Sequence, residues 1–126
     1  MLARVIVCGG RDFRDKELCF ETLKKVLAEY DSVEIVSGHA RGADTYGEEF
    51  AKIHGIKVSI FKPDWKLYGR GAGPVRNRQM LKYALEENAV IVAFWDGASK
   101  GTKNMIEQAK EAGAIVHTVI YSAQEM

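Results

Sequence analysis

Four glycine-rich turns, each following a short apolar run, hold most of the residue types in this chain that could bind an anion. Glycine lets the backbone approach a ligand closely, and arginine offers planar, charge-assisted hydrogen bonds. In an open α/β sheet, ligands bind outside the carboxyl ends of the strands. We therefore expect an anion site for a phosphate-bearing ligand. Its candidate residues are Gly9, Gly10, Arg11, Ser37, Gly38, Arg41, Gly42, Asp44, Arg76, Asn77, Asp96, Ser99, Gly101 and Thr102.

The second of these turns, residues 37–44, opens a helical pattern. Gly38 and Gly42 permit close approach and positive φ, and the helix start offers free N–H groups at a positive dipole end. Arg41 adds a planar donor. The alternative is an ordinary strand-to-helix turn, in which Asp44 only complements the helix dipole.

The last turn, residues 96–102, repeats this arrangement at the head of another helical pattern. Ser99 is a candidate N-cap, and Thr102 can present both its hydroxyl and its N–H to an anion. Asp96 could accept a hydrogen bond from a ribose hydroxyl, hold a metal-bound water, or only start the turn. The segment is not a P-loop, because the spacing of its glycines is one residue too short.

Cations far apart in the sequence are expected to gather around these turns. A phosphate clamp needs roughly two arginines. Asn77, the neighbour of Arg76, could contact a base edge or a ribose hydroxyl. The arginines near predicted strand ends or helix starts are Arg11, Arg41, Arg70, Arg76 and Arg78.

Aromatic rings supply a second candidate mode of binding, because stacking on a nucleobase contributes about 1–3 kcal/mol. Trp65 and Tyr68 lie where a lid over the ligand would sit, although both could instead cover the edge of the sheet. Trp95 is a third candidate. Among the histidines, only His39 falls in a candidate turn. Neither a Ser-His-Asp set nor a metal-spaced cluster can be assembled, so no metal site is expected.

Hydrophobic periodicity predicts strands that alternate with helices. Strands are expected at residues 2–8, 33–36, 56–60, 89–94 and 114–120. Helices are expected at residues 15–30 and 43–54, from Pro74 onward, and along the face 102–112. Residues 62–73 are expected to be irregular, with Pro74 in the first turn of the third helix.

This alternation predicts a single α/β domain over residues 1–126, a Rossmann-like three-layer sandwich. We expect a five-stranded parallel sheet in the order 3-2-1-4-5, with helices on both faces and right-handed crossovers. The crevice for a ligand would then open between the first and fourth strands.

Composition narrows the classes of function. A chain of 126 residues with 47% hydrophobic residues can bury a core without disulfides or a metal. A net charge of +1 predicts no general attraction to nucleic acid or membrane. We expect reduced thiols at Cys8 and Cys19 in a soluble, cytoplasmic protein, since no apolar run is long enough to span a membrane and no signal-like segment begins the chain.

Four segments together resemble the YspA-type branch of the SLOG superfamily, over residues 3–120. They are VIVCGGRDF (5–13), SGHARGAD (37–44), GPVRNRQM (73–80) and AFWDGASKGT (93–102). The resemblance implies a Rossmann-like fold related to Lonely Guy phosphoribohydrolases and to DprA, in a group with many bacterial and phage-encoded members. It implies binding of nucleotides or nucleotide-derived signals such as ADP-ribose and NAD derivatives. Self-association of relatives leaves a homo-oligomer open.

One departure from that pattern bears on activity. Lonely Guy-type enzymes carry a Pro-Gly-Gly-x-Gly-Thr-x-x-Glu motif, whose glutamate is needed for glycosidic cleavage. Gly101 and Thr102 match it, but Met105 takes the place of the glutamate, and Glu107 comes two residues later. Two residues rotate a helical side chain by about 200°, so we expect Glu107 to face away from the site.

The loss of this carboxylate favours binding over hydrolysis. We expect a sensor or sequestering domain for a small nucleotide-derived ligand, with no required cofactor. An alternative is a nucleotide N-glycosidase in which Asp44 or Asp96 supplies the carboxylate. A single-strand nucleic-acid binder, by analogy with DprA, is disfavoured because its phosphate contacts would need more clustered cations than this net charge suggests.

Overall fold

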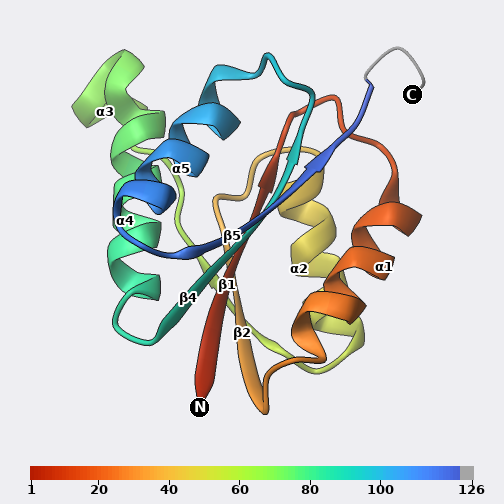
Figure 1. Ribbon diagram of the computed structural model, residues 1–126. Coiled ribbons are helices and arrows are strands. Elements are labelled where there is room, and N and C mark those ends of the chain that lie inside the picture. The colour runs from red at the N-terminus through yellow and green to blue at the C-terminus, as the bar shows by residue number, and fades with distance from the viewer. Residues whose placement is uncertain (123–126) are drawn as a thin grey trace.

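The computed structural model describes residues 1–122 and contains one five-stranded parallel sheet (Figure 1). Its strands are ordered β3-β2-β1-β4-β5, which confirms the order predicted from the sequence. In the sheet, Val5 lies between Ile35 and Val90 on the two neighbouring strands. The strands are β1 (Leu2–Gly9), β2 (Ser32–Ser37), β3 (Lys57–Ile60), β4 (Asn88–Trp95) and β5 (Ile115–Ile120).

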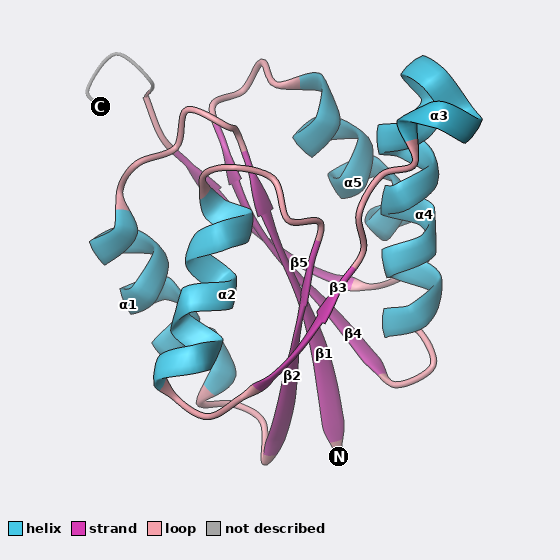
Figure 2. Ribbon diagram, turned by 180° about the vertical axis from the view of Figure 1, so that it is seen from behind, coloured by secondary structure: helices cyan, strands magenta, loops and turns pink. Residues whose placement is uncertain are grey.

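Helices cover both faces of this sheet, which confirms the three-layer arrangement (Figures 1 and 2). On one face lie α1 and α2, and on the other lie α4 and α5, with the short α3 beside α4. The helices are α1 (Lys16–Leu27), α2 (Ala43–Ile53), α3 (Trp65–Tyr68), α4 (Ala72–Ala84) and α5 (Lys100–Glu111). Within residues 1–122, no helix combines the length and the apolar character that a membrane crossing requires.

The central strand β1 contributes side chains to two separate cores. Val5 and Val7 pack in the core under α1 and α2, whereas Ile6 and Cys8 pack in the core under α4 and α5. All four side chains are buried. Such a continuous apolar run is typical of a strand covered on both faces. The chain that leaves β1 therefore emerges at the middle of the carboxyl edge of the sheet.

The prediction that residues 62–73 are irregular is wrong, because α3, a 3-10 turn (Gly69–Gly71) and the start of α4 occupy this stretch. Asp64 begins α3 by accepting a hydrogen bond from the N–H of Leu67 at 3.0 Å. Pro74 falls in the first turn of α4, where the missing N–H costs nothing. No apolar periodicity marks α3 because its side chains are exposed, with Leu67 at 67%.

A buried charged cluster ties three strands to α4 away from the carboxyl edge. Glu34 on β2 accepts hydrogen bonds of 2.5 Å from the hydroxyls of Ser59 and Tyr83. Arg4 on β1 donates to the same carboxylate at 3.3 Å, and Lys57 lies 4.0 Å from it. Burial alone would raise the pKa of Glu34, but these hydroxyls and cations outweigh it and lower the pKa below its ordinary value.

Candidate functional site

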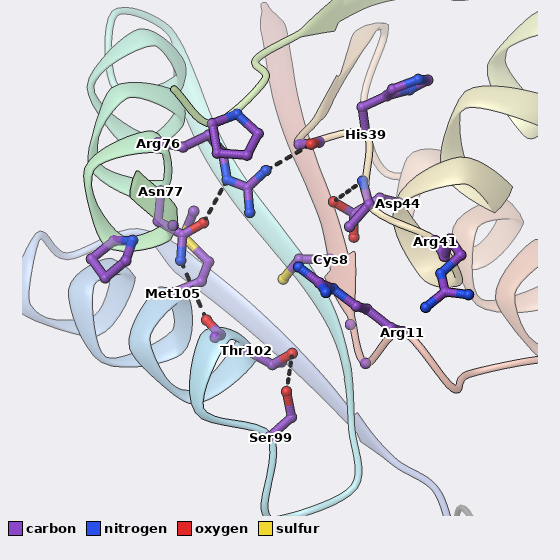
Figure 3. A pocket seen from close by; sticks show the side chains of 18 of the residues that line it. Cys8, Arg11, His39, Arg41, Asp44, Arg76, Asn77, Ser99, Thr102 and Met105 are labelled. Carbon is purple, nitrogen blue, oxygen red and sulfur yellow. Dashed lines mark hydrogen bonds between the residues drawn. The ribbon is translucent and has the colours of Figure 1, made fainter. Parts of the chain in front are cut away.

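A crevice of about 840 Å³ opens at the carboxyl edge of the sheet (Figure 3). Residues from all four glycine-rich turns contribute to its walls. Cys8 forms part of its floor, and the rest of the wall comes from the loops after β1, β2, β3 and β4 and from the helices that follow them. The predicted site residues that line it are Gly9, Gly10, Arg11, Gly38, Arg41, Asp44, Arg76, Asn77, Ser99, Gly101 and Thr102.

Three predicted residues lie outside the lining, and two of them shape the turn after β2. Ser37 is fully buried, and its hydroxyl donates to Glu48 at 2.7 Å and accepts from the N–H of His39 at 3.0 Å. Gly42 has φ of 88°, and a Cβ there would lie 2.4 Å from the carbonyl oxygen of Gly10. Both residues therefore hold the turn in place from behind the crevice.

Asp96 is the third residue outside the lining. Its Oδ1 accepts hydrogen bonds from the N–H groups of Ala98 at 2.9 Å and of Ser99 at 2.7 Å. These N–H groups of Ser99 and Ala98 hold the pKa of Asp96 below its ordinary value. Among the three roles considered for Asp96, this geometry favours the one in which it only starts the turn.

Arg76 bridges the start of α4 to the turn after β2. Its Nη1 donates to the carbonyl oxygen of Gly38 at 2.7 Å, and its Nε donates to Oδ1 of Asn77 at 3.1 Å. A Cβ on Gly38 would lie 2.3 Å from Nη1, so this close approach needs glycine. The guanidinium is thus fixed over the crevice with donors left for a ligand (Figure 3).

Asn77 uses its amide within the protein. Its Nδ2 donates to the carbonyl oxygen of Gly101 at 3.3 Å and to Oδ1 of Asn104 at 3.1 Å, while its Oδ1 accepts from Arg76. With its side chain nearly covered, Asn77 connects α4 to the start of α5. This arrangement suits the orientation of Arg76 better than the direct contact with a base or a ribose that the sequence suggested.

Asp44, in the first turn of α2, is a buried carboxyl group that faces the crevice. Only 3% of the residue is exposed, and its Oδ2 accepts a hydrogen bond of 3.4 Å from the N–H of Ala40. Burial raises the pKa of Asp44 to about 7, although Arg76 and the backbone N–H groups oppose the rise. The burial of Cys8 on the floor likewise raises the pKa of its thiol. Asp44 can therefore change its protonation state near neutral pH.

Three longer helices, α2, α4 and α5, begin at the crevice without a side-chain cap. The residues that precede them are Gly42, Gly71 and Ser99, and none provides a side-chain hydrogen bond to the helix start. Ser99 occupies the predicted N-cap position of α5, but its side chain makes no capping hydrogen bond to the helix: its hydroxyl lies 3.4 Å from that of Thr102. By contrast, Asp15 caps α1 and Asp64 caps α3. Uncapped N–H groups and the positive dipole ends of α2 and α5 favour an anion in the crevice.

Charged side chains in the lining carry an excess of positive charge. The carboxylates are Asp12 and Asp44. The cations are Arg11, Arg41, Lys62, Arg70 and Arg76. Arg78 is not part of the lining, because it points from the exposed side of α4. In Figure 3 the side chain of Arg11 extends across the crevice toward Cys8.

The three aromatic candidates occupy different places. Trp65 lines the crevice and is 52% exposed, whereas Tyr68, at 42%, lies outside the lining. Trp95 packs against the core under α4 and α5, and its Nε1 donates to the carbonyl oxygen of Ser99 at 3.1 Å. Of the three rings, only that of Trp65 can therefore reach a ligand in this crevice.

His39 lies at the rim with φ of 61°, an uncommon value for a residue other than glycine. Its Nδ1 lies 2.8 Å from a carboxylate oxygen of Glu48. The ring points away from Arg76 and Cys8 in Figure 3, so His39 shapes the loop instead of facing the floor. Within residues 1–122, no group of three or more His, Cys, Asp or Glu side chains is placed to hold a metal ion.

Met105 stands where the Lonely Guy-type motif has its glutamate. Met105 lines the crevice and is buried, at 1% exposed. Glu107 is exposed on α5 and is not part of the lining, as the helical rotation predicts. A thioether thus replaces a carboxylate on this wall.

Sequence reasoning missed several residues of the lining. Lys62 falls in a stretch predicted to be irregular, and Asp12 was considered only as part of a motif. Cys8 was treated only as a reduced thiol, although it forms part of the floor. Its place after an apolar run and before two glycines is the signal that could have identified it.

Comparisons with known proteins identify a matching family and a solved structure with a similar fold. The YspA, cpYpsA-related SLOG family (YAcAr) matches residues 3–68. DNA processing protein A (DprA) from Streptococcus pneumoniae is a structural neighbour with a TM-score of 0.52 and 18% sequence identity. The superposition covers 99% of this chain but 60% of the DprA chain, so this chain spans about three fifths of that neighbour. No curated protein gives a match.

Proposed function

We propose that this chain, which belongs to the YspA, cpYpsA-related SLOG family, binds a nucleotide-related ligand in the crevice through its phosphate groups. One observation carries the proposal: the uncapped starts of α2 and α5 lie at one crevice with an excess of cationic side chains. Helix N-termini and arginines are the groups that proteins use to hold phosphates. The volume of about 840 Å³ also suits a ligand of nucleotide size.

Within this proposal, the ligand belongs to the ADP-ribose and NAD-derivative class, and the protein acts as its sensor or sequestering domain. Phosphates would lie at the starts of α2 and α5, near Arg76 and Arg11. Trp65 would cover a base from the rim, where a half-exposed ring can stack. No further cofactor takes part in this mode of binding.

A thermal-shift panel tests the proposal. The ligands are ADP, ADP-ribose, cyclic ADP-ribose and NAD, with adenosine as the uncharged comparison. A ligand that binds only the folded protein stabilises it by about 2.7 kcal/mol at a hundredfold excess over Kd. We expect a rise in Tm with at least one phosphate-bearing compound and none with adenosine. An equal rise with adenosine, or no rise with any compound, would contradict the proposal.

A second candidate function, hydrolysis of a nucleotide N-glycosidic bond, is favoured by one observation. Asp44 is a buried carboxyl group at the crevice with a pKa raised to about 7, as suits a group that exchanges a proton near neutral pH. Met105 in place of a carboxylate weighs against this candidate. Chromatography of each ligand after prolonged incubation tests it: release of free base by the protein but not by Asp44→Asn would support hydrolysis.

A further inference from the structure

Tyr121 follows β5 and packs on the loop after β1, far away in the sequence. Its hydroxyl donates to Oδ1 of Asp12 at 2.6 Å. Its ring meets that of Phe13 edge-on, with centroids 4.9 Å apart. The residue is buried, at 8% exposed, and is not part of the crevice lining. Tyr121 therefore contacts the loop from the side opposite the ligand site.

The hydroxyl of Tyr121 also lies against Gly10. A Cβ at Gly10 would be 2.2 Å from this oxygen, so the loop reaches the tyrosine only because residue 10 has no side chain. The N–H of Gly10 donates to the carbonyl oxygen of Phe94 at 3.3 Å, and its carbonyl oxygen accepts from the N–H of Phe13 at 3.2 Å. Arg11 lies between Gly10 and Asp12, so the hydroxyl of Tyr121 contacts the residues on both sides of this arginine: it lies against Gly10 and bonds to the carboxylate of Asp12.

Arg11 depends on its backbone for its position. Its side chain crosses the crevice in Figure 3 with no hydrogen bond to any of the residues drawn there. Arg76, by contrast, is held by Gly38 and Asn77 through its own guanidinium. A long side chain that no neighbour among the drawn residues fixes loses rotamer freedom when it binds, so the direction in which the backbone presents it matters for affinity.

We infer that Tyr121 is a positioning residue of the anion site: through its hydroxyl bond to Asp12 and its contact with Gly10, it directs Arg11 across the crevice. This inference rests on the proposed function. It assigns a role in ligand binding to a residue at the opposite end of the chain from the loop that it holds. A side chain at residue 10 would displace the tyrosine hydroxyl, independently of any contact with a ligand.

The test is a calorimetric titration of the full chain with ADP. The variants are Tyr121→Phe, Arg11→Ala and the double variant, and Tyr30→Phe is the matched control. Tyr30 is a partly buried tyrosine that packs on the same core as Tyr121. We expect Tyr121→Phe and Arg11→Ala each to weaken binding by about fivefold, the equivalent of about 1 kcal/mol, which is the net contribution of one typical hydrogen bond.

The double variant separates positioning from general structural support. If Tyr121 acts through Arg11, the double variant binds no more weakly than Arg11→Ala, because coupled residues are not additive. An equal loss from Tyr121→Phe in both backgrounds would overturn the inference. Two other results would also overturn it. One is full affinity of Tyr121→Phe while Arg11→Ala binds ADP more weakly, and the other is full affinity of Arg11→Ala. Failure of the unaltered protein to bind ADP or any other panel ligand would instead refute the proposed function.

Asp12 provides a second route to the same answer if Tyr121→Phe proves poorly folded. Asp12→Asn and Asp12→Ala remove the same negative charge, but only asparagine keeps an oxygen that can accept the tyrosine hydroxyl. We expect Asp12→Asn to bind ADP at least as tightly as the unaltered protein, and Asp12→Ala more weakly than Asp12→Asn. Equal affinities of these two variants would overturn the inference.

Discussion

Arg76 and Gly38 are 38 residues apart in the chain, yet Nη1 of the arginine donates to the glycine carbonyl oxygen at 2.7 Å. This bond joins the start of α4 to the turn after β2 across the crevice. It fixes a cation beside the uncapped start of α2 and close to the buried carboxyl group of Asp44. The site therefore depends on glycine at position 38 as much as on the arginine.

Replacing Gly38 with alanine should disrupt the site without a positive-φ penalty. The new Cβ would lie 2.3 Å from Nη1 of Arg76 and 3.0 Å from Oδ2 of Asp44, so the guanidinium must move. We expect affinity for ADP-ribose to fall by about tenfold, the equivalent of about 1.4 kcal/mol, in calorimetric titrations. Gly71→Ala is the control, because a Cβ there meets no atom within 4 Å. If Gly38→Ala and Gly71→Ala bound ADP-ribose equally well, the close approach of Arg76 to residue 38 would not matter for binding.

Binding of an anion should weaken as pH rises through neutrality. The pKa of Asp44 is raised to about 7, so the carboxyl group is mostly neutral at pH 6 and mostly negative at pH 8. A negative Asp44 repels a phosphate, and the protonated form does not. With ADP-ribose, whose diphosphate keeps its charge over this range, we expect affinity to be on the order of threefold to tenfold higher at pH 6.

Asp44→Asn separates this carboxyl group from other titrating groups. The amide cannot ionise, so the variant should bind ADP-ribose with the same affinity at pH 6 and pH 8. Calorimetry at the two pH values measures the difference directly. If the variant kept the full pH dependence of the unaltered protein, the effect would belong to another group.

Trp65 and Tyr68 lie on the same short helix but should differ in their effect on binding. Trp65 lines the crevice and Tyr68 does not. Trp65→Ala should weaken binding of ADP-ribose by about tenfold, as the loss of one base–aromatic stack predicts. Tyr68→Ala should leave the affinity unchanged. The same rank order measured with ribose 5-phosphate, which has no base, would contradict a stacking role for Trp65.

The stability of the fold should depend on Glu34 and on pH in a defined direction. In the folded protein the pKa of Glu34 lies below its ordinary value. The ionised carboxylate therefore contributes to the free energy of unfolding above a pH of about 4.5, and this contribution is lost as the pH falls. We expect Glu34→Gln to lower the free energy of unfolding by about 2–3 kcal/mol at pH 7 and by less at pH 4 in urea titrations. Glu86→Gln, at an exposed partner of Arg4, should change it by less than about 0.5 kcal/mol. If the loss of unfolding free energy in Glu34→Gln grew as the pH was lowered, the result would contradict this assignment.

The sequence predicts the strand order because alternating strands and helices leave few topologies for a parallel sheet. It also predicts which turns meet, since the carboxyl ends of parallel strands share one edge. The short α3 escaped prediction because its exposed side chains show no apolar periodicity and its start depends on the cap by Asp64. The start of α4 lies two residues before the predicted Pro74. Local pattern does reveal glycine and arginine at the turns, but not what each side chain contacts.

Long-range partners explain most of what sequence reasoning missed at the site. The amide of Asn77 is used by Gly101 and Asn104 on another helix. Asp12 receives the hydroxyl of Tyr121, more than 100 residues away. Such pairs depend on how helices and loops pack, and no spacing within one segment encodes them.

The most direct test of the anion site is a titration of the ¹⁵N-labelled protein with ADP-ribose, followed by the amide resonances in two-dimensional NMR spectra. The account predicts that the largest shifts fall on the free N–H groups at the starts of α2 and α5, from Ala43 to Thr45 and from Lys100 to Thr102. The amides around Glu34 should move little. Saturable shifts confined to residues outside the crevice, or no shifts at all with any phosphate-bearing ligand of the panel, would contradict the proposal that these helix starts hold phosphate.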